Sequence, residues 1–223
     1  MNMKLGDSVI VKQGVKEPDL EEFELSGWQG RVSKIDTKSD KDNILITIEW
    51  DSLTLRQIPS YYIEHSEREG LDWKNMTLYE SELELTTPRD KKENVKRTQS
   101  KLSDQHYWDS LGDEGTRISK VLNKVDPHDE MKCFQKWVEY LDKELTFPIQ
   151  AIVSDSVHGW LIKTGDKVII KSLPHIADMY GIIASIRLNG EKYEFPLCDL
   201  EAIDNSTADF QLIDDYRMWF ANR

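Results

Sequence analysis

The sequence predicts a mainly β fold with some α-helix, of the α+β class, arranged as two small β-barrels that are joined by a linker and a helix and followed by a C-terminal helix. Three observations lead to this prediction: a weak internal repeat, short alternating apolar runs bounded by Gly and Pro, and two segments with helical periodicity. The 223 residues, with 39% hydrophobic content, suffice for two small cores. We expect domains at residues 1–88 and 126–223, with a polar, basic linker at residues 89–125.

The internal repeat consists of three blocks that recur in the same order at the two ends of the chain. GDSVIVK at residues 6–12 matches GDKVIIK at 165–171, WQGRVSKI at 28–35 parallels MYGIIASI at 179–186, and IPSYYIE at 58–64 parallels FPLCDLE at 195–201. In each copy a Gly-Asp turn opens a strand, a Gly permits a bend before a second strand, and a Pro-containing turn precedes a last strand that carries Glu. This order is typical of an SH3-like barrel.

The segments outside the repeat complete the prediction. Residues 70–85 are expected to form another strand or extended arm that closes the first domain. Residues 89–125 are rich in Lys and poor in apolar residues, which is typical of a linker, although Tyr107 and Trp108 can anchor part of it.

Two helices are expected in the second half of the chain. The first covers residues 126–145, with Asp126 as the N-cap and Pro127 at the first helical position. Its apolar stripe consists of Met131, Phe134, Val138, Leu141 and Leu145. The second covers residues 209–222, and its apolar face consists of Leu212, Ile213, Tyr216, Trp219 and Phe220.

Composition excludes several classes of function. The net charge of −12 argues against nucleic-acid binding, because affinity for phosphate backbones comes from clustered Lys and Arg. No apolar run approaches the roughly 18 residues that predict a membrane span, and the first residues have no signal-peptide pattern. The two cysteines, Cys133 and Cys198, are expected to be reduced and buried. Together these features predict a cytoplasmic protein.

Motifs that would indicate catalysis are missing from the sequence. It contains no GxxxxGK[ST] or GxGxxG phosphate-binding loop and no GxSxG nucleophile elbow. Its five histidines form neither an HExxH motif nor a pair at i, i+4 spacing, so no local pattern predicts a zinc site. We therefore expect a protein that is not an enzyme.

Carboxylates are the remaining candidates for a functional site. From Glu194 to Asp215 the chain has no Lys or Arg. Calcium takes about six to eight oxygen ligands, which carboxylates and loop carbonyls can supply. The candidate ligands are Asp199, Glu201, Asp204, Asp209, Asp214 and Asp215. The EF-hand template does not fit, since Asp209 would stand where that loop requires Gly.

A structural interpretation of the same residues stays open. In this interpretation Asp209 caps the last helix, Asp214 and Asp215 lie on its solvated face, and Glu201 pairs with a neighbouring Lys. If the acidic stretch is not the site, the next candidates are residues 17–24 and the group Glu139, Asp142 and Glu144.

The second half of the chain resembles a known family. The segments FQKWVEYLDKELTFPIQAIV, TGDKVIIK, MYGIIASI, YEFPLCDLEAID and QLIDDYRMWFANR, within residues 130–223, are similar to the cyanobacterial-type calcium-binding proteins, which are small, acidic and lack EF-hands. The segments GWQGRVSKI, IEWDSLTLRQIP and GLDWKNMTLYESELE resemble the N-terminal domain that accompanies this family in bacterial proteins. The resemblance implies Ca²⁺ as the bound ion, without assigning its ligands.

Two functions are therefore expected. The first is a non-enzymatic calcium-binding protein, a buffer or a sensor, that uses carboxylates of the C-terminal domain. The second is a protein-interaction module without a metal, in which grooves lined by Trp28, Trp50 or Tyr180 bind a peptide of a partner protein. Trp28 and Tyr180 occupy matching positions of the repeat, so a packing role is an equal possibility for both.

Overall fold

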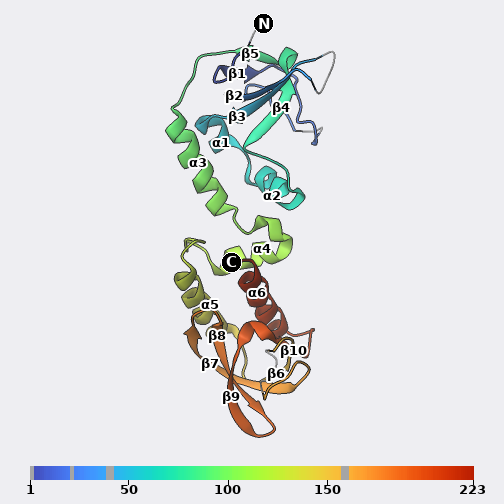
Figure 1. Ribbon diagram of the computed structural model, residues 1–223, viewed down its shortest axis with the longest axis vertical. Coiled ribbons are helices and arrows are strands. Elements are labelled where there is room, and N and C mark those ends of the chain that lie inside the picture. Colours follow the sequence, from blue (N-terminus) through green and yellow to red (C-terminus); the bar gives the residue numbers. More distant parts are fainter. Residues whose placement is uncertain (1–2, 21–22, 39–42, 157–160) are drawn as a thin grey trace. The chain divides into compact units, whose positions relative to one another are not determined.

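The computed structural model describes residues 3–20, 23–38, 43–156 and 161–223, and the chain divides into two compact units. The N-terminal unit is Met1–Ser110 and the C-terminal unit is Leu111–Arg223. Each unit contains a five-stranded antiparallel sheet together with helices (Figure 1). The predicted mixture of strands and helices is thus confirmed. No helix within the described ranges has both the length and the apolar character needed to cross a membrane.

The N-terminal unit is built around one antiparallel sheet. Its elements are β1 (Ser8–Val11), β2 (Gln29–Asp36), β3 (Leu45–Trp50), α1 (Ser52–Gln57), α2 (Ser60–Glu69), β4 (Asn75–Tyr79), the 3-10 helix η1 (Glu80–Glu82), β5 (Leu83–Leu85) and α3 (Lys92–Gln105); a second 3-10 helix, η2 (Asp109–Leu111), lies at the boundary. The strand order is β4-β3-β2-β1-β5. The last strand therefore pairs with the first, although β4 precedes it in the chain.

The C-terminal unit repeats this arrangement. Its elements are α4 (Gly112–Val121), α5 (Glu130–Glu144), β6 (Ile149–Val153), β7 (Lys167–Ala177), β8 (Gly181–Leu188), β9 (Glu191–Pro196), the 3-10 helix η3 (Leu197–Asp199), β10 (Leu200–Ala202) and α6 (Ala208–Asn222). The strand order is β10-β6-β7-β8-β9, so a 3-10 helix again carries the chain from one edge of the sheet to the other.

The repeat in the structure is one strand out of register with the repeat in the sequence. GDSVIVK leads into β1, the first strand of its sheet, whereas GDKVIIK leads into β7, the second strand. The two Gly-Asp turns nevertheless have the same hydrogen bonds, since the amides of Lys4 and Lys163 each donate to an aspartate, Asp7 or Asp166, at 2.8 Å. The same kind of turn thus precedes the first strand of one sheet and the second strand of the other.

The third sequence block was assigned wrongly in its first copy. Residues 58–64 were expected to contain a last strand, but they lie between and within helices α1 and α2. The segment with the same place as FPLCDLE is instead MTLYESELEL at residues 76–85, which forms β4, η1 and β5. In both segments an acidic residue ends the 3-10 helix and a Leu-Glu pair opens the last strand.

The predicted closed barrels are also wrong. Within the described residues, β4 pairs only with β3 and β9 only with β8, so both sheets are open. In the N-terminal unit the strands that would have to meet, β4 and β5, lie at opposite edges with three strands between them. The ladder hydrogen bonds that remove a sheet edge in a barrel are therefore not formed.

Helices occupy much of the predicted linker. α3 packs against α1, and its Val95 is only 2% exposed in the core of the N-terminal unit. α4 packs against α6 in the C-terminal unit. Val95, Thr98 and Leu102 form a narrow, buried or partly buried stripe at helical spacing on α3, and the surrounding Lys residues concealed this stripe in the composition.

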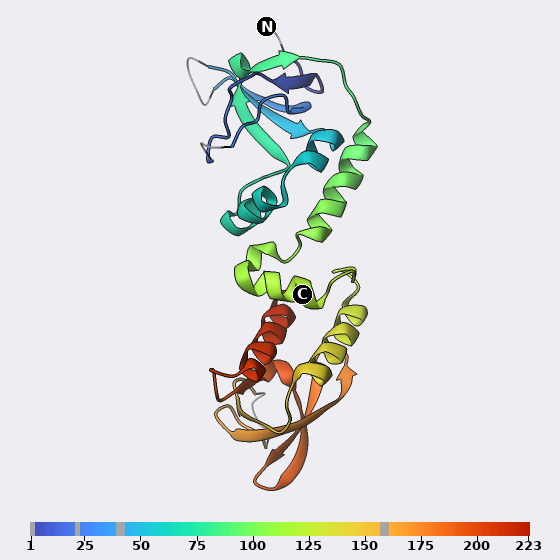
Figure 2. The same cartoon turned by 180° about the vertical axis from the view of Figure 1, so that it is seen from behind.

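The two long helices of the C-terminal unit lie on the same side of its sheet (Figure 2). α5 packs against β7 and β8, and α6 packs against β10 and η3. α5 begins at Glu130, later than predicted, because Asp129 rather than Asp126 accepts a hydrogen bond from the amide of Lys132 at 3.1 Å. The buried face of α5 consists of Cys133, Phe134, Trp137 and Leu141, so Met131, which is 46% exposed, is not part of it.

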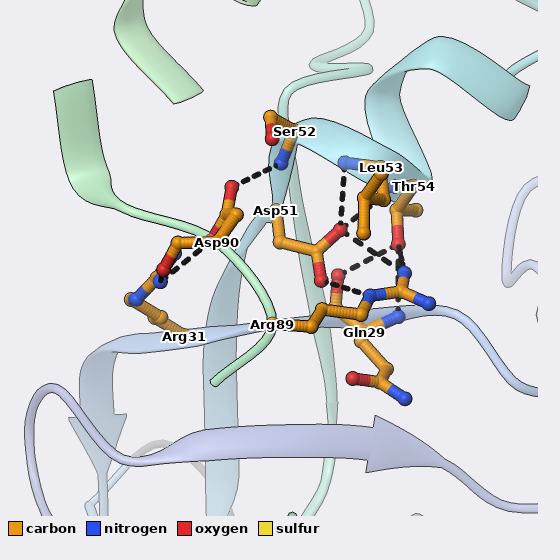
Figure 3. A network of polar contacts seen from close by, with 8 residues as sticks. All are labelled: Gln29, Arg31, Asp51, Ser52, Leu53, Thr54, Arg89 and Asp90. Carbon is orange, nitrogen blue, oxygen red and sulfur yellow. Dashed lines mark hydrogen bonds and ion pairs between the residues drawn. The ribbon is translucent and has the colours of Figure 1, made fainter. Parts of the chain in front are cut away.

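The chain between β5 and α3 is fastened to the N-terminal sheet by a network of charged groups (Figure 3). Asp51 caps α1 by accepting from the amides of Leu53 and Thr54, and it forms an ion pair with Arg89 at 2.5 Å. Asp90 accepts from the amide of Ser52 at 2.7 Å and forms an ion pair with Arg31 at 2.6 Å. The neighbouring residues Arg89 and Asp90 thus hold both the start of α1 and the central strand β2.

We expect Asp51→Ala to lower the free energy of unfolding of the N-terminal unit by about 2 to 4 kcal/mol, because it removes a helix cap and leaves Arg89 without its buried partner. The measurement is urea unfolding of the full chain followed by tryptophan fluorescence. The control is Asp142→Ala, at an exposed position of α5. Equal midpoints for wild type and Asp51→Ala would contradict a stabilising role of the network.

A fragment of residues 1–110 is expected to unfold cooperatively and at a higher urea concentration than a fragment of residues 1–88. The shorter fragment lacks Arg89, Asp90 and the buried Val95, so it loses both the network and part of the core. Unfolding of the two fragments, followed by circular dichroism, checks this. Identical midpoints would place the domain boundary at residue 88.

Candidate metal centre

The six candidate carboxylates come to different places in the C-terminal unit. Asp199 ends η3, Glu201 lies in β10, Asp204 lies in the turn after β10, and Asp209, Asp214 and Asp215 lie on α6. Their partners divide them into two sets. Glu201 and Asp214 form ion pairs with one arginine, whose charge also acts on Asp199, whereas Asp204, Asp209 and Asp215 each have a separate structural partner.

Arg217, on α6, is the arginine at the centre of the first set. Its Nε donates to the carbonyl oxygen of Cys198 at 3.1 Å, which anchors the guanidinium beneath η3. Its NH1 lies 3.4 Å from a carboxylate oxygen of Asp214 and 3.6 Å from one of Glu201. We call Asp155, Asp199, Glu201 and Asp214 with Arg217 the Arg217 cluster.

Asp155 joins this cluster from the end of β6. β10 pairs with β6 in the register Leu200↔Val153, and the amide of Ser154 donates to the carbonyl oxygen of Asp199 at 2.8 Å. The Ser154 hydroxyl in turn accepts from Arg217 at 3.3 Å. The negative charge of Asp155 acts on Asp199. The strand pairing therefore adds a fourth carboxylate that the acidic stretch does not contain.

The cluster contains four carboxylates and one positive charge, that of Arg217. Burial raises the pKa of Asp199 above its usual value, and the charge of Asp155 raises it further, while Arg217 and the Cys198 thiol lower it. Burial and the charge of Asp199 raise the pKa of Cys198 to about 12, so this thiol stays protonated and is a poor metal ligand. The cluster therefore offers hard oxygen donors and an excess of negative charge.

The carboxylates of the cluster are not gathered at a single point. Among the described residues of this unit, no three acidic side chains bring oxygen atoms within 4.8 Å of one another. The guanidinium of Arg217 lies between Asp214 and Glu201. A metal ion would thus require these side chains to turn away from Arg217 and toward the ion.

Asp215 serves the packing of α6. It is 5% exposed, and both of its oxygens accept from Nε of Arg117 on α4 at 2.9 Å. Gln211 donates a further hydrogen bond at 3.0 Å. Burial raises the pKa of Asp215, and the contact with Arg117 opposes that rise. An ion-paired, buried carboxylate of this kind holds two helices together and has no free oxygen directed to solvent.

Asp204 and Asp209 have local roles. One oxygen of Asp204 accepts from the amide and the hydroxyl of Ser206, at 3.0 and 2.6 Å, which closes the turn before α6. Asp209 accepts from the amide of Thr146 at 3.1 Å. The cap of α6 is Thr207, whose hydroxyl accepts from the amide of Phe210, so Asp209 is not the cap.

The other acidic segments considered in the sequence have their own partners. Glu17 is buried and accepts from the amide of Asp19 at 2.7 Å, while Glu21 and Glu22 lie outside the described residues. Glu139 pairs with Lys136, and Glu144 pairs with Lys143, both on the surface of α5. These contacts favour the Arg217 cluster over either segment.

The aromatic residues considered for a peptide groove lie in different surroundings. Trp50 is fully buried, and Trp28 packs edge-on against it with ring centroids 5.2 Å apart. Tyr180 is 50% exposed and belongs to the other unit. The tryptophans therefore fill a core, as the packing interpretation of Trp28 anticipates.

Comparison with known proteins finds one family match, and it lies in the C-terminal unit. Residues 117–220 match the model of the CcbP family, which is described as calcium binding. This segment is therefore similar to that family. The match covers all four carboxylates of the Arg217 cluster and Arg217 itself, together with the Arg117–Asp215 pair. The family resemblance found in the sequence is thus confirmed for this half of the chain.

Two solved structures are similar to about half of the chain. A crystal structure of CcbP from Anabaena shares 21% identity over 48% of this chain and 90% of that chain, with a TM-score of 0.40. A calcium-binding protein in its calcium-binding form shares 22% identity over 51% of this chain and 95% of that chain, with a TM-score of 0.41. No curated protein matches the chain by sequence.

Sequence reasoning missed Asp155 and Arg217 as members of the cluster. Both lie outside the segment between residues 194 and 215 in which carboxylates were sought. The available signal was the Ser-Asp-Ser run at residues 154–156, which directly follows the segment that forms β6. Only the pairing of β6 with β10 makes that run a neighbour of Asp199.

The raised pKa of Asp199 predicts a pH effect in calcium-free protein. A carboxylate whose pKa is higher in the folded state destabilises that state as pH rises from its unfolded value, about 3.9, through the folded value. Asp199→Asn does not titrate in this range, so its stability relative to wild type is expected to increase between pH 4 and pH 7. Thermal unfolding in chelator across this range measures the difference, with Asp142→Asn as the control. A difference that stays constant with pH would show that Asp199 is not strained by its surroundings.

Proposed function

We propose that this protein binds calcium without catalysing a reaction, as a buffer or a sensor, and that the ligands come from the Arg217 cluster of the C-terminal unit. One observation carries the proposal. Glu201 and Asp214 pair with Arg217, and Asp199 feels the charges of both Arg217 and Asp155, all within the segment that matches a calcium-binding family.

The donor set of the cluster suits calcium better than softer ions. Its side chains provide carboxylate and hydroxyl oxygens, and the carbonyl groups of η3 are adjacent. Calcium accepts six to eight such oxygens and tolerates irregular geometry, so carboxylates from a strand, a turn and a helix can be combined with water. Glu201 and Asp214 are both partly exposed, which leaves water access to the cluster.

Arg217 gives the cluster a defined state without calcium. Carboxylates close together repel one another, and the guanidinium offsets part of that repulsion. Calcium brings two positive charges, and it can contact several oxygens directly. We therefore expect calcium to compete with Arg217 for Glu201 and Asp214, so that the arginine acts as an internal counter-ion that the metal replaces.

The test is calorimetric titration of chelator-treated full-length protein with calcium and, separately, with magnesium. Asp199→Asn, Glu201→Gln and Asp214→Asn are each expected to weaken calcium binding by at least about tenfold, because calcium affinity follows the number of charged ligands. Calcium should also raise the melting temperature by mass action. Free calcium near 100 times Kd adds about 2.7 kcal/mol to the free energy of unfolding.

Asp204→Asn and Asp209→Asn are the matched controls. Both remove an acidic charge from the same stretch, but their carboxylates contact Ser206 and Thr146 rather than Arg217. They should keep the wild-type stoichiometry and change the affinity little. If the controls lose binding while the cluster variants retain it, the ligands lie at the turn before α6 instead of around Arg217.

The same titration distinguishes a sensor from a buffer. Trp219 lies on α6, packs in the core and is two residues from Arg217. Displacement of Arg217 that shifts α6 would change the fluorescence and near-ultraviolet circular dichroism of the unit in proportion to bound calcium. Such a change indicates a sensor, and unchanged spectra at full occupancy indicate a buffer.

A further inference from the structure

A second group of possible metal ligands lies in the N-terminal unit, outside the family match. Glu64, His106 and Asp109 each offer one ligand atom, and these atoms lie within 4.8 Å of one another. In the part of the chain that the structure describes, no other group of three His, Cys, Asp or Glu residues meets this distance. The group therefore differs from the Arg217 cluster in both its position and its compactness.

The local fold fixes two members of the group. His106 follows α3 directly, and its amide donates to the carbonyl oxygen of Leu102 at 2.9 Å. Asp109 opens η2, and its amide donates to the carbonyl oxygen of His106 at 3.1 Å. Trp108, between them, is 5% exposed and anchors the turn. The third member, Glu64, comes from the exposed side of α2.

Within the described part of the chain, the buried imidazole of His106 has a hydrogen-bond partner at only one of its two ring nitrogens. Its Nδ1 lies 2.5 Å from a carboxylate oxygen of Asp109, and the side chain is 5% exposed. Its Nε2 is buried and has no hydrogen-bond partner among the described residues. When Nδ1 carries the proton toward Asp109, the lone pair is on Nε2, and a buried polar atom without a partner requires an explanation.

We propose that Glu64, His106 and Asp109 form a binding site for one divalent transition-metal ion of the zinc class. His106 binds through a ring nitrogen, and Glu64 and Asp109 each bind through a carboxylate oxygen. Three protein ligands with water at the remaining position form a common arrangement at zinc sites that keep an open position.

The donor chemistry separates this site from the proposed calcium site. Imidazole nitrogen suits zinc and its neighbours in the transition series, whereas calcium prefers oxygen alone. The two carboxylates also match the double positive charge of the ion. The site shares no residue with the Arg217 cluster, so the two proposals stand or fall separately.

The test uses the full-length protein, saturated with calcium, in two measurements. Zinc affinity is measured by competition with a chromophoric chelator, and cobalt(II) is added to record the visible absorption that reports nitrogen and oxygen ligation. Wild type is expected to bind one equivalent of either metal. His106→Gln should abolish this equivalent, and Glu64→Gln and Asp109→Asn should each weaken it by at least the roughly 10-fold to 100-fold loss that removal of an outer-shell partner causes at metal sites.

His175→Gln is the control, because this histidine is 48% exposed at its side chain and lies in the other unit. It should leave zinc affinity and the cobalt spectrum unchanged. Since His106 is buried, circular dichroism must show that His106→Gln is folded. If His106→Gln is unfolded, Glu64→Gln provides the test, because Glu64 is exposed. Wild-type zinc affinity in folded His106→Gln or in Glu64→Gln would overturn the proposal, as would failure of the wild-type protein to bind zinc.

Discussion

The pairing of the last strand of each sheet with its first strand is the contact on which both units depend. A 3-10 helix carries the chain across the sheet, so that β5 lies beside β1 and β10 lies beside β6. In the C-terminal unit this pairing places the end of β6 next to η3, and α6 follows immediately. Strand, turn and helix therefore meet at one corner, and the proposed calcium ligands of the unit lie there.

That corner explains how an acidic stretch without its own base can fold. Arg217 comes from the next turn of α6 and Arg117 comes from α4, 98 residues from Asp215. The two arginines have different tasks. Arg117 forms a largely shielded pair that joins helices, whereas Arg217 is shared among partly exposed carboxylates whose mutual repulsion it offsets only in part. The cluster therefore keeps an excess of negative charge that attracts a cation.

The sequence was a good guide to elements and a poor guide to their connections. Alternating apolar runs and Gly-Asp turns indicated strands such as β1 and β7, because these signals depend on neighbouring residues. The repeat was nevertheless read one strand out of register, since identical turns can open any strand of a sheet. α3 was read as a linker, because its helical stripe is narrow and only its packing against α1 makes it part of a core.

The candidate sites divide in the same way. The sequence by itself determined that residues 117–220 resemble a calcium-binding family and that acidic oxygen donors are concentrated near the end of this segment, since family motifs and composition are local properties. Tertiary structure alone decided which carboxylates lie near one another. Asp155 comes near Asp199 only because β6 pairs with β10. It also brought Glu64 to His106, 42 positions away, where no spacing rule could connect them. Metal sites depend on distances in space, and separation along the chain does not fix those distances.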